Sequence, residues 1–148
     1  MDLKTRIMDD MKSAMRSKDS ARLESIRMIR AAIQRREVDE RVALDDAGVL
    51  QVLQKMLKQA RDSVQQFEAG GRNDLVARER ASIAVLESYL PEPLSDAELD
   101  RLIDEAIELS GAATVRDMGK VMGTLKSKVE GRADMGALGA RVKQRLGT

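Results

Sequence analysis

Cysteine and histidine are both absent from this chain of 148 residues. Without cysteine, the chain can form neither a disulfide nor a thiolate metal site. Without histidine, it lacks the commonest general base, the usual partner of a serine nucleophile and the commonest metal ligand. The groups that remain for catalysis are carboxylates, lysines, hydroxyls and one tyrosine. No motif among them indicates a catalytic residue, a cofactor site or a metal site.

Aromatic residues and long apolar runs are also scarce. Phe67 and Tyr89 are the only aromatic residues, which argues against the stacking surfaces that bind single-stranded nucleic acid. No apolar run is long enough to span a membrane. The charged start of the chain, residues 1–4, lacks the apolar stretch of a signal peptide. We therefore expect a cytoplasmic protein with no membrane partner and no DNA partner.

The residues that dominate the chain are strong helix formers, mainly alanine, leucine, methionine, glutamate, glutamine, lysine and arginine. No segment alternates between apolar and polar residues as a half-buried strand does. The sequence therefore predicts an all-α protein with seven helices. Their expected positions are 3–18, 22–40, 46–69, 74–90, a fifth from the Ser95 cap to Gly111, a sixth from the Thr114 cap to Gly131, and a seventh from the Asp134 cap onward.

Both prolines of the chain lie between the fourth and fifth predicted helices, at Pro91 and Pro93. Proline lacks a backbone N–H and biases the preceding residue away from the helical region, so this segment should be a stiff joint. The sequence thus predicts two helical bundles. Residues 1–90 would form an N-terminal four-helix bundle, and residues 91–148 a C-terminal three-helix unit.

Charge is unevenly distributed although the net charge is only +1. Residues 91–111 contain seven acids and one arginine, a net charge of −6. Residues 112–148 contain eight bases and three acids, a net charge of +5. A basic end segment is a candidate contact surface for a polyanion, although an ordinary solvated helical surface can have the same composition.

Five segments, taken in order and with their spacing, resemble the GatB/YqeY family. They are RLESIRMIR at 22–30, FEAGGRNDL at 67–75, YLPEPLS at 89–95, DMGKVMG at 117–123 and GRAD at 131–134. The resemblance implies a fold of two helical bundles, of four and three helices. It also implies kinship with the tail of the B subunit of glutamine-dependent Asp-tRNA/Glu-tRNA amidotransferases, and with modules appended to some glutaminyl-tRNA synthetases.

In those proteins the similar module holds tRNA while another domain performs the chemistry. The resemblance therefore implies a tRNA-binding accessory module, with an aminoacyl-tRNA synthetase or amidotransferase subunits as further partners. A carbon–nitrogen ligase activity with glutamine as amido-nitrogen donor would follow from family membership alone. The chain is too short for the kinase-like body of that subunit, so we do not expect it to catalyse the reaction by itself. The alternatives are a helical protein–protein adaptor without RNA binding and a vestigial amidotransferase subunit.

Basic residues of the predicted sixth and seventh helices are the candidate RNA contacts. They are Arg116, Lys120, Lys126, Lys128, Arg132 and Lys143. A helical wheel places Arg116, Lys120 and Lys128 opposite the apolar stripe of the sixth helix. With no aromatic platform and no base-reading motif, recognition would be of the RNA shape and backbone.

Three glycines accompany these bases, namely Gly119, Gly123 and Gly131. A glycine inside a helix costs about 1 kcal/mol relative to alanine, so two in one short helix indicate that something approaches closely. That neighbour is either a phosphate backbone or another helix, and we expect packing against the seventh helix to explain at least one of the two. Gly131 begins a turn into a helix N-terminus, which favours anions.

Two charges project into the apolar stripes of the first bundle, Arg30 on the second helix and Glu79 on the fourth. Without a nucleophile or base nearby, they are better explained as a structural ion pair than as a catalytic pair. Arg30 could equally choose another carboxylate. We expect at least one of the two to be largely buried and paired with an opposite charge from another helix.

Overall fold

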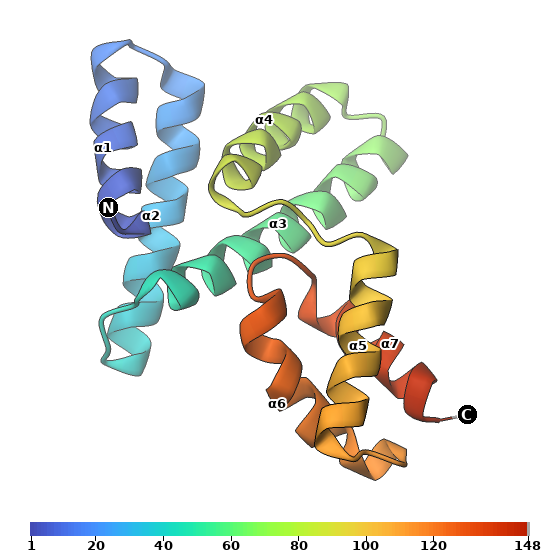
Figure 1. Cartoon of the computed structure of the whole chain (residues 1–148). Coiled ribbons are helices and arrows are strands. Elements are labelled where there is room, and N and C mark those ends of the chain that lie inside the picture. Colours follow the sequence, from blue (N-terminus) through green and yellow to red (C-terminus); the bar gives the residue numbers. More distant parts are fainter. Residues whose placement is uncertain (148) are drawn as a thin grey trace. The chain divides into compact units, whose positions relative to one another are not determined.

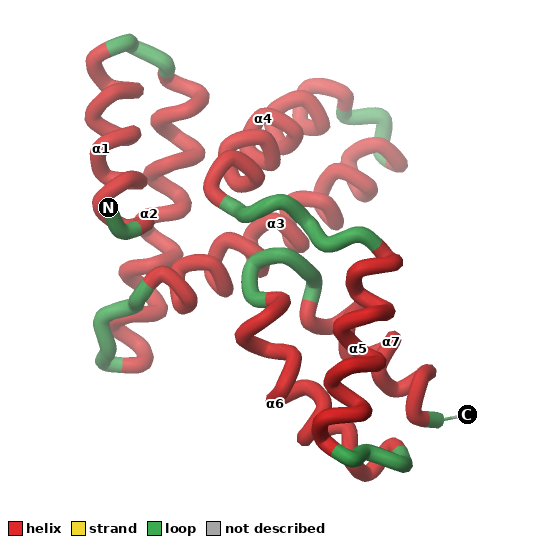
Figure 2. Tube along the Cα trace, viewed as in Figure 1, coloured by secondary structure: helices red, strands yellow, loops and turns green. Residues whose placement is uncertain are grey.

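The computed structural model describes residues 1–147, and within them all regular structure is helical (Figure 2). This confirms the all-α prediction. The elements are α1 (Leu3–Arg16), α2 (Ser20–Glu40), α3 (Asp46–Ala69), α4 (Asn73–Tyr89), α5 (Asp96–Ser110), the 3₁₀ turn η1 (Val115–Asp117), α6 (Met118–Val129) and α7 (Met135–Leu146). Figure 1 shows their order along the chain. None of the helices within this range is long and apolar enough to cross a membrane.

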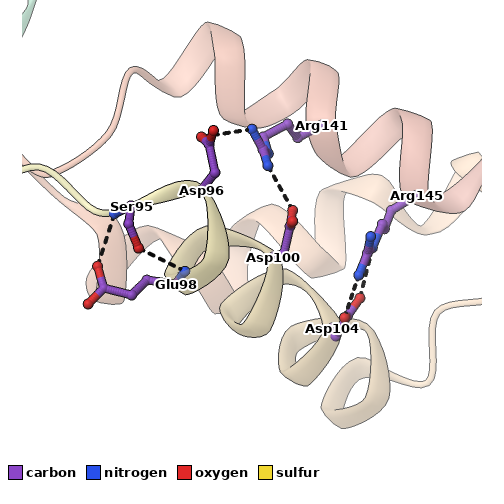
Figure 3. Close-up of polar contacts among 7 residues, drawn as sticks. All are labelled: Ser95, Asp96, Glu98, Asp100, Asp104, Arg141 and Arg145. Atoms are coloured by element: carbon purple, nitrogen blue, oxygen red, sulfur yellow. Dashed lines mark hydrogen bonds and ion pairs between the residues drawn. The ribbon is translucent and has the colours of Figure 1, made fainter.

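Side-chain caps explain where most helices begin. Asp2, Asp19, Asp45 and Asp134 each accept a hydrogen bond from a backbone N–H of the helix that follows. Such a bond satisfies a donor that has no partner inside the helix. At α5, Ser95 and Glu98 form the reciprocal capping box that the sequence predicts (Figure 3).

The sixth helix begins later than predicted. Thr114 is followed by the 3₁₀ turn η1, and α6 proper begins at Met118. The carboxylate of Asp117 accepts hydrogen bonds from the backbone N–H groups of Ala113 and Thr114, at 2.9 and 3.2 Å. These bonds hold the pKa of Asp117 below its ordinary value. Because the bonds close the chain into a tight turn, the α-helix starts after Asp117.

The chain divides into two compact units, Met1–Pro91 and Glu92–Thr148. In the N-terminal unit, α3 packs along α4, α1 packs along α2, and α2 contacts both α3 and α4. The core is formed by apolar residues spaced three or four apart on these helices, which places them on one face of each. Its fully buried members include Ile7, Ile26, Ile29, Val49 and Leu53.

The C-terminal unit has a separate core built from α5, α6 and α7. Val121, Leu125 and Val129 form the buried face of α6, and each is 0% exposed. They pack with Ile103 of α5 and Val142 of α7. Because α6 buries only this face, its opposite face is available for other contacts.

Candidate nucleic-acid interface

An ion-pair ladder joins α5 to α7 (Figure 3). Arg141 donates to Asp96 at 3.2 Å and to Asp100 at 2.9 Å, and Arg145 makes a two-pronged contact with Asp104. The hydrogen bond from Arg141 lowers the pKa of Asp100, and the same bond raises the pKa of Arg141. Both arginines of α7 are therefore used inside the fold. The charge of +5 that the sequence assigns to residues 112–148 overstates the free positive charge.

The remaining bases of this unit are outside the ladder. Within residues 1–147, none of the following makes an ion pair with a carboxylate: Arg116, Lys120, Lys126, Lys128, Arg132 and Lys143. All except Arg132 are exposed. Ion pairing thus separates the two arginines that hold α5 to α7 from the other basic residues of the unit, which are Arg101 of α5 and the six that the sequence singled out.

Three of the six lysines and arginines lie on one helix. Lys120, Lys126 and Lys128 are exposed on α6 and belong to what we call the α6 face. The α6 face consists of Gly119, Lys120, Gly123, Lys126, Ser127 and Lys128, all exposed. Helical geometry places Gly123, Ser127 and Lys120 near its centre and the two other lysines on its flanks. The other bases are not on this helix: Arg116 precedes it, Arg132 follows it and Lys143 lies on α7.

The two glycines of α6 face open space. A Cβ atom built at Gly119 or at Gly123 would meet no other atom within 4 Å among the described residues. The expectation that packing against the seventh helix explains at least one of them is therefore wrong. Gly139 of α7 is the glycine that packs against α6, since its Cβ would lie 3.4 Å from the methyl group of Met118. The α6 face is consequently open at its two glycines, with Lys120 near its centre and the two other lysines on its flanks.

The turn after α6 is held by contacts within the fold. Gly131 is buried and has a φ of +74°, a left-handed conformation that glycine adopts without steric cost. The guanidinium of Arg132 donates to the backbone carbonyl of Glu92 at 2.8 Å, and Leu94 donates its N–H to the carbonyl of Arg132 at 3.0 Å. Asp134 caps α7 through the N–H of Gly136. Arg132 thus anchors the segment that leads into α5, and Asp134 occupies part of the helix N-terminus.

The structure does not bring Arg30 and Glu79 together. Arg30 is half-buried and donates to the sulfur of Met11 at 3.2 Å, and it has no carboxylate partner within residues 1–147. Glu79 is also half-buried but lines cavities beside Ser25 and Met28 of α2. Arg30 of α2 therefore contacts α1, whereas Glu79 of α4 lies beside a different part of α2. A helical wheel predicts which face of its own helix each charge occupies, but it does not predict which neighbouring helix that face contacts.

Two polar networks of the fold were not predicted from the sequence. One is the ladder, although its signal is present as acids four residues apart at Asp96, Asp100 and Asp104 and arginines four apart on α7. The other joins α1 and α4, where the Tyr89 hydroxyl donates to Asp10 at 2.5 Å. Burial and the bond to Asp10 raise the pKa of Tyr89 to about 12. No local pattern signals that contact, because its partners are far apart in sequence.

The amino-acid sequence matches a known protein family and several known proteins. The family described as "Yqey-like protein" matches residues 4–146, almost the full length of the chain. The chain belongs to the YqeY-like family. The predicted resemblance is therefore confirmed.

Several fungal proteins are similar to this YqeY-like chain, each named "Altered inheritance of mitochondria protein 41, mitochondrial". The protein of Pyrenophora tritici-repentis is 34% identical over 130 residues, which covers 86% of this chain and 71% of the relative. That of Lachancea thermotolerans is 27% identical over 146 residues, covering 94% and 78%. That of Saccharomyces cerevisiae strain YJM789 is 30% identical over 100 residues, covering 67% and 53%.

These names contradict the expected cytoplasmic location, because each assigns its protein to mitochondria. The expectation was wrong for a physical reason. The absence of an apolar N-terminal stretch argues against secretion only, since the segments that direct proteins into mitochondria are amphipathic and arginine-rich rather than apolar.

Proposed function

We propose that this YqeY-like chain is an RNA-binding accessory module whose C-terminal unit holds folded tRNA by its backbone. The observation that carries the proposal is the division of charge in that unit. Arg141 and Arg145 are neutralised by acids of α5, whereas Lys120, Lys126 and Lys128 are exposed on the α6 face without an ion pair among the described residues. Lysines that are exposed and unpaired on one helix face can neutralise the charges of a phosphate backbone.

The shape of the α6 face supports a backbone ligand. Gly119 and Gly123 leave room for close approach, Lys120 lies near the centre of the face, and the two other lysines stand on its flanks. Lysine acts on phosphate as a flexible point charge and reads no base by itself. Such contacts fix position and carry no sequence information, so binding should extend to all folded tRNAs alike.

The adaptor alternative is weakened by the same ladder. Three of the acids of α5 that could dock onto a basic partner, Asp96, Asp100 and Asp104, already pair with arginines of α7. They are therefore less available to a second protein. Within the proposal, the amido-transfer chemistry implied by the family resemblance takes place in a partner subunit, and this chain contributes tRNA binding.

Filter binding of bulk tRNA to the full chain, over a series of KCl concentrations, tests the proposal. If about four bases neutralise phosphates, log K should fall with log salt at a slope of roughly −3 to −4. The combined variant Lys120→Ala, Lys126→Ala and Lys128→Ala should reduce the magnitude of that slope by about 2 to 3. Arg132 is left intact because its contact with Glu92 supports the fold.

A matched control removes the same charge elsewhere. The variant Lys12→Ala, Lys55→Ala and Lys58→Ala takes three exposed lysines from the N-terminal unit and should leave the slope unchanged. If wild type shows no salt-sensitive binding to folded tRNA, the proposal fails and the adaptor becomes the better explanation. The proposal also fails if the two triple variants weaken binding equally.

A further inference from the structure

Three carboxylates of the N-terminal unit are half-buried, and two of them have partners. Asp10 accepts from Tyr89, and Glu37 accepts from Lys4 and from the N–H of Leu44. The third, Glu79 of α4, makes no hydrogen bond and no ion pair with any residue that the structure describes. A carboxylate that loses part of its hydration without gaining a partner is destabilising, so an external partner would be favoured there.

Glu79 borders two adjoining cavities between α2, α3 and α4. One has a volume of about 200 Å³ and the other about 310 Å³. Both are lined by Ser25, Met28, Glu79 and Ser82. The hydroxyls of Ser25 and Ser82 lie 3.1 Å apart, and this contact joins α2 to α4.

The linings of the two cavities favour a cation with an apolar stem. Glu79 is the single charged residue of the smaller cavity. In the larger one, Glu24 and Arg78 neutralise each other at 2.7 Å, so Glu79 again supplies the net charge. The remaining walls are largely apolar, with Met28, Ile29, Met56, Ala60 and Leu86 around the smaller cavity and Phe67 and Leu75 at the larger one.

We propose that this site binds an ammonium or guanidinium group carried on a short aliphatic stem. The cationic group pairs with Glu79 and donates to the hydroxyls of Ser25 and Ser82. The stem packs on Met28 and Met56, whose unbranched and polarizable side chains adapt to ligands of different shape. Met28 is 58% exposed despite its size, which leaves an apolar surface at the mouth of the site uncovered. Such a group is found in small amines and in the lysine or arginine side chains of another protein.

The methyl groups of the methionines allow binding at this site to be measured by NMR. With ¹³C-methyl methionine in the full chain, n-butylammonium should give saturable shifts of the Met28 and Met56 signals. Met118 and Met122, which are partly buried and pack against the core of the other unit, are internal references. Neutral n-butanol should shift the same signals less, and butyrate should not shift them. Glu79→Gln keeps the shape of the side chain and should weaken binding of n-butylammonium about fivefold, the upper range for a partly exposed pair.

Asp62→Asn is the matched control, since it removes an exposed carboxylate of the same unit that lines neither cavity. It should bind n-butylammonium as wild type does. The site assignment is overturned if the Met28 and Met56 signals do not respond to the cation, or if they respond equally in Glu79→Gln.

A second arm identifies the source of the cation. An amphipathic helical peptide with one lysine is compared with the same peptide carrying norleucine at that position. Tighter binding of the lysine peptide than of n-butylammonium supports a protein side chain as the occupant. Binding of n-butylammonium with no preference between the peptides supports a free amine.

Discussion

In the C-terminal unit the two arginines of α7 pair inside the fold and the lysines of α6 stay in solvent, whereas the N-terminal unit leaves the half-buried carboxylate of Glu79 without a partner among the described residues. On α7, Arg141 and Arg145 pair with the acids of α5, and the α6 face keeps its lysines free of ion pairs within the described residues. In the N-terminal unit, ion pairs such as Arg78–Glu24 and Arg61–Glu87 lie at the surface, and Glu79 is the half-buried carboxylate without a partner among the described residues. The α6 face therefore presents unpaired positive charge, and the cavities beside Glu79 present an unpaired negative charge.

This difference shows that formal charge is a poor guide to a binding surface. The two segments of opposite sign in the C-terminal part, 91–111 and 112–148, neutralise each other in part, because the ladder pairs three acids of the first with two arginines of the second. What remains available to a partner is set by which side chains the packing leaves unpaired. The N-terminal unit makes the same point, because its surface ion pairs leave the half-buried Arg30 and Glu79 without an ion-pair partner among the described residues.

The largest expected effect is on the stability of one core without the other. Leu125→Ala removes a fully buried side chain from the C-terminal core and should lower the free energy of unfolding of that unit by roughly 2–5 kcal/mol. The single tyrosine, Tyr89, belongs to the other core, so its fluorescence reports on the N-terminal unit alone. In urea, Leu125→Ala should shift the early part of the far-UV circular dichroism transition and leave the tyrosine midpoint unchanged.

The reciprocal variant is Ile29→Ala in the N-terminal core. It should lower the urea midpoint of the tyrosine fluorescence. The methyl signals of Met118 and Met122 should keep their native positions up to the same urea concentration as in wild type. If Leu125→Ala moves the tyrosine midpoint as well, the two units unfold as one, and the proposed division of the chain at residues 90–91 into separate domains is wrong.

The next effect concerns the contact between α1 and α4. Tyr89 is 4% exposed and donates to Asp10, so Tyr89→Phe leaves a half-buried carboxylate with only the distant Arg22, at 3.8 Å. The cost should be about 1–2 kcal/mol, reduced from the usual value for a charged hydrogen bond because Asp10 is partly exposed. Urea unfolding of the single variants and of Tyr89→Phe with Asp10→Ala forms a double-mutant cycle. Additive costs would show that the two side chains do not interact.

The same contact predicts a dependence on alkaline pH. The folded-state pKa of Tyr89 is raised from 10.0 to about 12. A group whose pKa is higher in the folded state stabilises the protein below its unfolded pKa, and that stabilisation is lost as the pH rises between the two values. Wild type should therefore lose more stability than Tyr89→Phe between about pH 10 and about pH 12. Equal losses would mean that Tyr89 titrates normally.

The sequence was sufficient for the fold because helix signals are local. Caps such as Ser95 with Glu98, the glycine stop at Gly111 and the stripes of apolar residues all act within a few residues. Contacts between helices were not predictable in the same way. A wheel showed that Arg30 and Glu79 face inward but could not show that they face different neighbours. The open space at Gly119 and Gly123 likewise depends on where α7 lies, which no local pattern specifies.

A smaller effect tests whether the open face of α6 is used. Gly123→Ala should raise the stability of the C-terminal unit by about 0.5–1 kcal/mol, because alanine loses less conformational freedom in a helix and its Cβ meets no described atom. If a phosphate backbone approaches this face closely, the same methyl group should weaken tRNA binding. Thermal unfolding and filter binding measure the two effects. Gly139→Ala, on α7, is the control and should leave tRNA binding unchanged, and a Gly123→Ala variant that binds tRNA like wild type would exclude close approach at this point.

The smallest effect concerns acid unfolding of the ladder. Arg141 holds the pKa of Asp100 below its ordinary value of 3.8 in the folded state. A group whose folded-state pKa is lowered stabilises the fold above its unfolded pKa, and the stabilisation is lost as the pH falls through the folded value. The C-terminal unit should therefore lose stability below about pH 4, and Arg141→Ala should lose less over the same range. The difference should be small because the side chain of Asp100 is 43% exposed and water screens the pair.

Urea midpoints from the Met118 and Met122 signals, between about pH 5 and about pH 2, measure this difference in stability for the C-terminal unit alone. Lys126→Ala, which removes a base outside the ladder, should follow wild type, and an Arg141→Ala curve that coincides with both would mean that the ladder contributes nothing to stability.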